Sequence, residues 1–466
     1  MKITFEIKDE HISKLKYLIL GVFIILAISY AYFFEWANTN IYLLLAVIFA
    51  IYMAINLWAN DVANNMWPAV WAKAISLGWA IILAMIFEAS WALIAGSDVI
   101  DTIKWGIIDR SQIEWEMQFI AIMLSTLLWA ALWVNIATFL KAPVSITHAI
   151  FWGLIWAWIT SAWLSIVNWG MVWKIAIAWV IAIFMWAFVA ILLYISIRKT
   201  ILKQSHMWEA AKHWVPIYVA MMTWIFALYL ILKWFKSKMT WVKEFLENYS
   251  FSFNAMAIFV SVIIWVSIYT YLIIKYKNKQ KTFFEDNKEF VNKLFNLPLV
   301  FAVALLSFAH WANDVANAIW PLAAIYEEVK NTSESVSKIW VPFWIMILWA
   351  LFLSLWLAVF WARLIKTVWN QITKLDQTMA YSIALSAATT VIIASALWIP
   401  VSTTQIALGW VFWIWLYRQY LKRKQWKTKE VIKISKLKWI LLSWVVTLPV
   451  AWAISAMTYL VIMNVS

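Results

Sequence analysis

The chain has 466 residues, of which 65% are hydrophobic and 13% are charged, and its mean hydropathy is +0.80. This composition excludes a soluble globular protein and predicts an integral membrane protein. The absence of cysteine excludes disulfides, thiolate metal sites and cysteine nucleophiles. The net charge of +14 does not indicate a nucleic-acid partner, because Lys and Arg gather in the cytoplasmic loops of membrane proteins.

Apolar segments recur from one end of the chain to the other. A helix needs roughly 20 apolar residues to cross a bilayer, and we count thirteen segments of about this length. We therefore predict an all-α polytopic membrane protein with about 12 to 13 transmembrane helices. The segments are 16–34, 41–66, 72–95, 117–139, 145–166, 172–197, 215–235, 253–275, 296–326, 338–362, 379–398, 401–420 and 438–463.

The connections between these segments alternate in charge. The connections at 97 and 326 are acidic or mixed, whereas every second connection in the latter part of the chain is rich in Lys and Arg. Basic loops remain in the cytoplasm. We therefore expect a multi-pass protein of the cell membrane with a cytoplasmic N-terminus. The basic connections begin at residues 198, 275, 363 and 418.

Two motifs occur twice and in the same order. NLWANDVANNMWPAV at 56–70 returns as AHWANDVANAIWPLA at 309–323, and PVSITH at 143 returns as PVSTTQ at 400. The offsets are 253 residues (58 to 311) and 257 residues (143 to 400), which indicates two homologous halves. The Asn-Asp copies fall in the second and ninth segments, so the odd separation predicts halves of opposite orientation, as in many secondary transporters.

The repeat divides the chain into four expected regions. The regions are an N-terminal extension with an extra helix at 1–40, a first transport repeat at 41–197, central helices with basic loops at 198–295, and a second transport repeat at 296–466.

Tryptophan and glycine exchange places between the halves. Gly153 aligns with Trp410 and Trp152 with Gly409, although a close-packed interior cannot treat the largest and smallest residues as equivalent. The chain has 40 Trp and only 7 Gly, whereas glycine alone averages about 7% of residues. We hypothesise that most of these tryptophans are glycines in the cell, encoded by UGA codons that the lineage reads as glycine. The alternative is a protein truly rich in Trp, with aromatic belts.

Each Asn-Asp motif places an acid inside an apolar segment. An ionised Asp within the bilayer costs a few kcal/mol unless it is paired, so Asp61 and Asp314 are candidate functional residues. The alternative is that each one caps a helix. Read with glycine, the motifs would let the helix unwind, and Pro68 and Pro321 follow them. We therefore expect broken or re-entrant helices at the motifs.

Read with glycine at these positions, the chain resembles the inorganic phosphate transporter family (PiT). The resemblance rests on WANDVANN at 58, PVSITH at 143, WANDVANA at 311 and PVSTTQ at 400, and it covers roughly residues 50 to 200 and 285 to 465. It implies uptake of inorganic phosphate coupled to a cation gradient. Two residues depart from the family pattern, because Ile146 replaces a hydroxyl and Gln405 replaces a histidine.

The motif residues supply the expected binding groups. No Arg or Lys lies within a motif, so we expect a dipolar phosphate site of hydroxyls, amides and helix N-termini; for the hydroxyls the alternative is helix capping and packing. Sodium prefers oxygen ligands, and its charge would offset both carboxylate and phosphate. The phosphate-binding candidates are Asp61, Asn64, Ser145, Thr147, Asp314, Asn317, Ser402, Thr403 and Thr404, and the cation-binding candidates are Asn60, Asp61, Asn313 and Asp314.

Two further residues are candidates for a gate or a cation relay. Glu88 lies within an apolar segment, and the alternative is a position near the membrane interface. His148 lies within the first PVSITH motif and could carry a proton. The alternative for His148 is a neutral, hydrogen-bonded structural residue.

We therefore expect a sodium:phosphate symporter that works by alternating access in the lipid bilayer. It would need no cofactor other than Na⁺ as coupling ion and no further metal, and it would bind no nucleic acid; a homodimer is one option for its assembly. The alternatives are a proton-coupled carrier of phosphate or metal-phosphate, a sulfate permease, and, in another class, a non-transporting receptor. An enzyme is not expected, since the chain lacks a glycine-rich nucleotide loop and a nucleophile-base pair.

Overall fold

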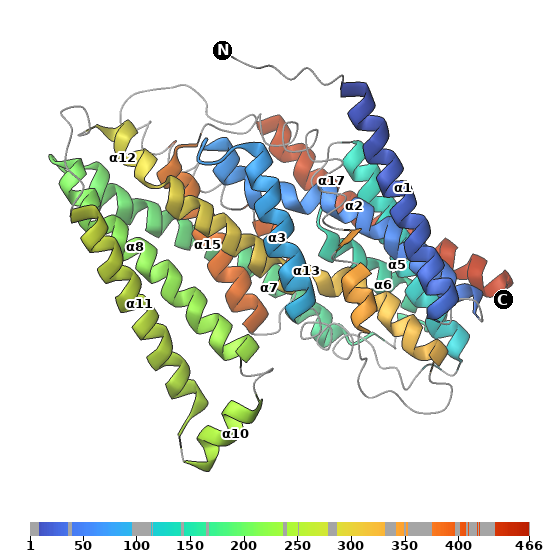
Figure 1. The fold of residues 1–466 in the computed structure, drawn as a ribbon. Coiled ribbons are helices and arrows are strands. Elements are labelled where there is room, and N and C mark those ends of the chain that lie inside the picture. Colours follow the sequence, from blue (N-terminus) through green and yellow to red (C-terminus); the bar gives the residue numbers. More distant parts are fainter. Residues whose placement is uncertain are drawn as a thin grey trace.

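The computed structural model consists of helices, and no β-strand occurs among the residues that it describes (Figure 1). The described residues are 9–35, 40–95, 113, 115–140, 144–164, 167–235, 240–249, 251–277, 287–330, 342–348, 351–352, 375–396, 401–406, 409, 417, 419 and 434–465. Within them, only the backbone is described for 9–17, 57–64, 89, 91–95, 233–234, 240, 247, 311–318, 395–396 and 434–441.

The helices are long and largely apolar. Two of them continue into short π-helical turns, η3 (Arg198–Leu202) after α7 and η4 (Ile231–Phe235) after α8. The α-helices are α1 (Asp9–Phe34), α2 (Ile41–Trp71), α3 (Leu77–Ala95), α5 (Glu116–Phe139), α6 (Ile146–Ala162), α7 (Trp169–Ile197), α8 (Met207–Leu230), α10 (Thr240–Asn248), α11 (Phe253–Lys277), α12 (Lys288–Leu294), α13 (Asn296–Lys330), α15 (Gln377–Ala396) and α17 (Ile434–Val465).

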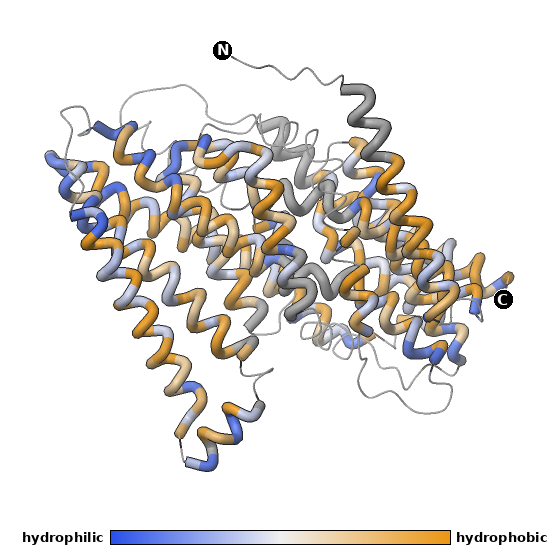
Figure 2. Tube along the Cα trace, in the orientation of Figure 1, coloured by the Kyte–Doolittle hydropathy of each residue, from blue (hydrophilic) through white to orange (hydrophobic). Residues whose placement is uncertain are grey.

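These helices bear out the all-α, multi-pass expectation. Every segment expected from the sequence, other than 338–362 and 401–420, corresponds to a described helix; those two lie largely outside the described residues. Among the described residues, six helices are long and apolar enough to cross a membrane, or seven if the bent pair α12 and α13 counts as one. The helix bodies are hydrophobic and the ends carry the polar residues (Figure 2), as a bilayer requires.

The expected helix breaks at the Asn-Asp motifs are wrong. The backbone of α2 is helical from Ile41 to Trp71, and that of α13 from Asn296 to Lys330, with Pro68 and Pro321 inside. A proline removes one backbone donor, which neighbouring helices can compensate in a membrane bundle, and Trp, unlike Gly, has an ordinary helix propensity. The described bend, of 43°, lies before the second motif, between α12 and the first part of α13.

The two motif helices form the centre of the bundle. α13 packs on α2, α2 packs on α5, and α13 packs on α15. The most apolar stretches of α5 and α15 are each 78% buried, whereas that of α11 is 11% buried. α8 and α11 lie side by side at one edge of the molecule, and α10 lies near their far ends (Figure 1). α5 and α15 are therefore interior helices, and α11 is peripheral.

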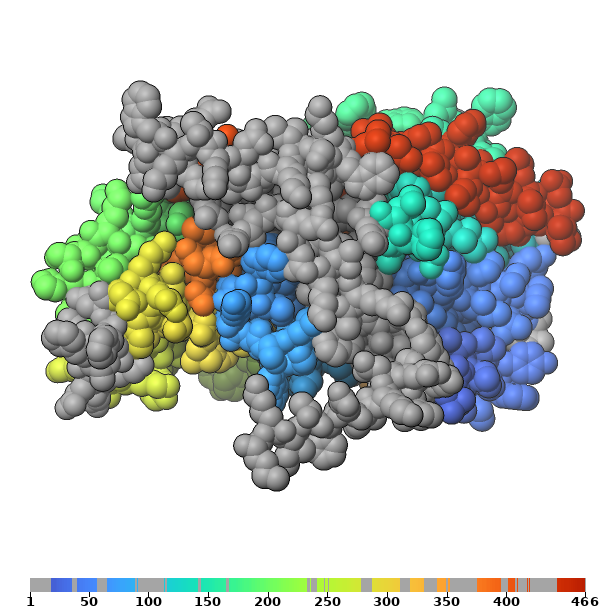
Figure 3. Space-filling view, turned by 90° about the horizontal axis from the view of Figure 1, so that it is seen from above, coloured from blue at the N-terminus to red at the C-terminus, as the bar shows by residue number. Residues whose placement is uncertain are grey.

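The first and second halves of the chain interlock. α7 packs on α15, which comes from the second half, and α17 packs on α5 and α6, which come from the first. Figure 3 shows α17 (red) beside segments of the first half. Ser455 on α17 donates a hydrogen bond to the carbonyl of Gly153 on α6 at 2.7 Å. Each half thus supplies an outer helix for the other.

Candidate functional site

The second motif starts a helix in both halves, as predicted. α6 begins at Ile146, and the Ser145 hydroxyl accepts the backbone N–H of His148 at 3.2 Å. In the second half, a helical turn covers 403–406, and the Ser402 hydroxyl accepts the backbone N–H of Gln405 at 3.2 Å. Both serines act as N-caps, which satisfies amide groups that the first turn leaves without an intrahelical partner.

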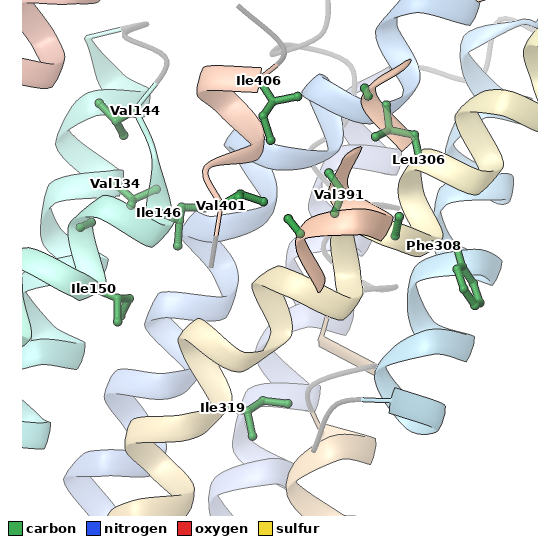
Figure 4. Packing of buried hydrophobic residues seen from close by; sticks show 14 of the residues in the cluster. Val134, Val144, Ile146, Ile150, Leu306, Phe308, Ile319, Val391, Val401 and Ile406 are labelled. Carbon is green, nitrogen blue, oxygen red and sulfur yellow. The ribbon is translucent and has the colours of Figure 1, made fainter. Parts of the chain in front are cut away.

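The two helix starts cross each other and exchange hydrogen bonds. Thr147 Oγ1 donates to the carbonyl of Val401 at 3.4 Å, and Thr404 Oγ1 donates to the carbonyl of Val144 at 3.2 Å. Adding 257 to 147 and 144 gives 404 and 401, so each bond is the repeat image of the other. Figure 4 shows Ile146 beside Val401 at this crossing. Both threonines are buried.

A chain of buried polar side chains continues from the crossing toward α3. His310 Nε2 lies 2.8 Å from Thr403 Oγ1, and His310 Nδ1 lies 3.1 Å from Asn65 Nδ2. Asn65 Nδ2 also donates to Glu88 Oε1 at 3.1 Å. The exposed fractions are 0% for Glu88 and His310, 1% for Asn65 and 6% for Thr403. This polar chain therefore joins α3, α2, α13 and the PVSTTQ motif at 400 away from bulk water.

The orientation of the Asn65 amide is linked to the tautomer of His310. The NH₂ group has two donors and no acceptor, so one N–H points to Glu88 and the other to Nδ1 of His310. With the amide in this orientation Nδ1 accepts and Nε2 carries the proton toward Thr403, and the opposite amide orientation would reverse these roles.

The structure brings some of the predicted residues together. Thr403 and Glu88 belong to the buried chain, and Ser145, Thr147, Ser402 and Thr404 surround the crossing. His148 lies apart from the chain, with its ring 3.9 Å from that of Trp179. The side chains of the first-motif candidates lie outside the described residues, although their backbone is helical. These candidates are Asn60, Asp61, Asn64, Asn313, Asp314 and Asn317.

Two residues of the polar chain, Asn65 and His310, are not among the candidates predicted from the sequence. His310 directly precedes the second WANDVAN, and Asn65 ends the first WANDVANN. An ionisable or strongly polar residue inside an apolar segment is itself a signal of function. Both residues lie inside apolar segments, so this rule applied to the sequence identifies them as candidates.

The described part of the chain contains no cluster of three or more His, Asp or Glu side chains that could hold a metal ion. The proposed sodium ligands have their side chains outside the described residues.

Comparisons with known proteins agree with one another. The family model described as the phosphate transporter family matches residues 58–455. A provisionally named phosphate permease of Helicobacter pylori (strain J99) is 39% identical over 428 residues, covering 90% of this chain and 78% of the relative. A similarly named protein of Pyrococcus abyssi is 33% identical over 418 residues, covering 90% of this chain and 97% of the relative.

A solved structure is also similar. The chain matches a structure described as the sodium-dependent phosphate transporter with a TM-score of 0.78 and 26% identity, covering 91% of this chain and all of that one. The family model spans both copies of both motifs, including the crossing and the polar chain beside it. The chain therefore belongs to the phosphate transporter family.

Proposed function

We propose that the protein imports inorganic phosphate by symport with Na⁺, through alternating access between two inverted halves. The observation that carries the proposal is the crossing of the two PVS motifs, where each half donates a hydroxyl to a carbonyl of the other. A joint of this kind, buried between related halves, is where inverted-repeat transporters bind their substrates.

Phosphate would bind at this joint through dipoles rather than lysine or arginine. Serine and threonine hydroxyls and the amides of two helix starts lie together there, and such helix starts favour anions. Asp61, Asn64, Asp314 and Asn317 would complete the site. Sodium held by Asn60, Asp61, Asn313 and Asp314 would cancel the repulsion between carboxylates and phosphate, so each solute would raise the affinity for the other.

Uptake of radiolabelled phosphate into proteoliposomes tests the coupling. An inward Na⁺ gradient should drive uptake, and replacing external Na⁺ by choline should abolish it. Uptake that is indifferent to Na⁺ would refute the sodium assignment. Equal competition by sulfate would refute phosphate as the preferred anion.

A second candidate, proton coupling, is favoured by the buried chain. If the Asn65 amide turns by a half-rotation, its oxygen would accept hydrogen bonds from a protonated Glu88 and from a proton on Nδ1 of His310. The polar chain can thus hold a proton on Glu88 or on His310. An inside-alkaline pH gradient without Na⁺ should then drive uptake, and Glu88→Gln should abolish this component. No proton-driven uptake by the wild-type chain would exclude this candidate.

We also propose a cytoplasmic N-terminus and a place in the cell membrane, with the two repeats at 41–197 and 296–466. The alternation of basic connections supports the orientation. The equal spacing of the paired contacts, 144 to 401 and 147 to 404, supports the assignment of the two repeats.

We further propose that most tryptophans of the chain are glycines in the cell. Several buried indole N–H groups have no hydrogen-bond partner among the described residues, including those of Trp133, Trp158, Trp186 and Trp320, whereas buried Trp usually finds one. A Cβ built on Gly153 would lie 2.8 Å from Nε1 of Trp129, so the two helices leave no room for both residues to be large. Gene sequencing and peptide mass spectrometry decide the matter; UGG codons at 58, 67, 311 and 320 would refute the proposal.

A further inference from the structure

A polar pocket lies where α7 ends and α8 begins, apart from the candidate site. Its volume is about 560 Å³, and its walls include Lys199, Thr200, Ser205, His206 and Trp214. α7 with η3 (Trp169–Leu202) and α8 (Met207–Leu230) are both candidate membrane spans. The pocket therefore opens at the place where two neighbouring spans leave the bilayer, at the level of lipid head groups.

The charge around the pocket is positive. Among the described residues, no Asp or Glu lines it. The segment 198–213 holds four Lys and Arg residues and one acid, Glu209. Glu209 lies 3.5 Å from Lys212, which offsets its charge. The side chain of Lys199 therefore faces a space without a carboxylate among its lining residues, which favours an anionic ligand.

The backbone adds hydrogen-bond donors at the same place. His206 precedes the first turn of α8, and its side chain makes no capping hydrogen bond to that turn. The first amides of a helix of this length favour a negative group. Ser205 contributes a hydroxyl at the pocket wall.

The walls of the pocket are held in place by hydrogen bonds between α7 and α8. The Tyr218 hydroxyl lies 2.6 Å from Ser196 Oγ and 3.1 Å from Thr200 Oγ1. The π turn closes through the N–H of Lys203 and the carbonyl of Arg198 at 2.9 Å. These bonds hold Thr200 in the pocket wall, whereas Lys199, Ser205 and His206 are exposed and accessible to a ligand from solution.

We propose that this pocket binds a phosphate group, either of free inorganic phosphate or of an anionic phospholipid. Lys199 supplies the charge, and Ser205 and the start of α8 supply hydrogen bonds. This site is separate from the transport site, and its occupancy does not depend on the proposed function.

The absence of cysteine from the chain gives a direct test. Ala210→Cys creates a single thiol at a lining position that has no role in the proposed binding, and its alkylation rate is measured on the full-length protein in neutral detergent. One arm adds inorganic phosphate, and the other adds mixed micelles that contain phosphatidylglycerol; chloride keeps the ionic strength constant. A bound phosphate group should slow alkylation by 1 + [L]/Kd, about tenfold at ten times Kd.

Second variants separate a specific site from charge screening. Lys199→Ala in the Ala210→Cys background should remove the protection, and Lys199→Arg should retain it. A thiol at Lys277→Cys, an exposed position at the end of α11, should react at the same rate with and without either probe. Protection by phosphate alone assigns free phosphate, and protection by the lipid alone assigns the head group. Protection by neither probe, or protection that survives Lys199→Ala, would overturn the proposal.

Discussion

Asn65 is the residue that joins the acid of the buried chain to its histidine. It reaches Glu88 on α3 and His310 on α13 with the two N–H bonds of one amide. A buried polar group is stable only when its hydrogen bonds are made. The amide therefore links the two neighbours, and a single substitution at Asn65 removes both of these contacts.

Asn65→Leu keeps the volume and removes both hydrogen bonds. We expect it to lower the stability of the folded protein by about 1 to 3 kcal/mol and to reduce phosphate uptake at least about tenfold, since Glu88 and His310 lose their common partner. Thermal unfolding in detergent and proteoliposome uptake measure the two effects. The matched control is Asn56→Leu on the same helix, because Asn56 accepts a hydrogen bond from Asn135, which is not part of the polar chain. Equal loss of uptake in both variants would contradict the special role of Asn65.

At the scale of elements, the two halves meet at the helix starts at 145 and 402, and the breaks expected at the Asn-Asp motifs do not occur. α2 and α13 run through their prolines as continuous helices. The described residues just before the two helix starts, 144–145 and 401–402, are non-helical and meet at the crossing. The threonines of the two helix starts bond to carbonyls of the opposite half.

The symmetry of the crossing makes a quantitative prediction. Thr147→Val and Thr404→Val should each destabilise the protein by about 0.5 to 1.5 kcal/mol, the usual net value of one hydrogen bond. Both should also reduce uptake, because each bond joins the two halves. Thr160→Val is the control, since Thr160 donates to the Trp156 carbonyl within its own helix. If only one of the two variants affects stability and uptake, the joint does not act symmetrically.

The contact between α5 and α6 is close at Gly153. Any side chain there would collide with the Trp129 ring, and overpacking of this kind typically costs about 1 to 3 kcal/mol. With Trp at 129, Gly153→Ala should therefore lower the unfolding temperature, and with glycine at 129 it should not. Gly78→Ala is the control, because no atom beyond its own helix backbone and chain neighbours lies within 4 Å of the new methyl group. If Gly153→Ala is tolerated and peptide mass spectrometry finds glycine at 129, the result supports recoding of tryptophan.

At the scale of the whole molecule, the halves are not two separate bodies. α17 packs on α5 and α6, and α7 packs on α15, so each half is completed by a helix of the other. An isolated half would leave α5 or α15 exposed, although both are mostly buried. Expression of residues 1–197 alone should therefore give a chain that is degraded or aggregated, as measured by size-exclusion chromatography after mild extraction. Co-expression with residues 198–466 should restore a folded, active complex; a stable monodisperse first half would refute the interdependence.

The orientation in the membrane is tested with the two ends of α11. Because the chain has no cysteine, Tyr249→Cys and Lys277→Cys each give one thiol, and both positions are exposed. With a cytoplasmic N-terminus, a membrane-impermeant reagent should label Tyr249→Cys in intact cells. It should label Lys277→Cys only after permeabilisation. The opposite pattern would invert the proposed topology.

The sequence by itself determined the membrane class, the helices and the family. Hydropathy depends on the local run of residues, so every segment outside 338–362 and 401–420 overlaps a described helix, with the largest errors at the starts of α1 (16 predicted, Asp9 observed) and α8 (215 predicted, Met207 observed). The repeated motifs, read in order, were enough to predict the family that the comparisons then showed. The N-capping of Ser145 and Ser402 was also local, since it depends on a hydroxyl at a helix start.

The tertiary structure alone decided which residues meet. Asn65, Glu88, His310 and Thr403 are spread over more than 300 residues, and no period or motif predicts that Asn65 faces both Glu88 and His310. The exchange of hydrogen bonds at the crossing likewise depends on how the halves pack. The continuity of α2 and α13 was misread because proline is costly in an isolated helix, whereas packing in a bundle compensates the missing hydrogen bond. Long-range contacts of this kind are set by packing, which a local pattern does not contain.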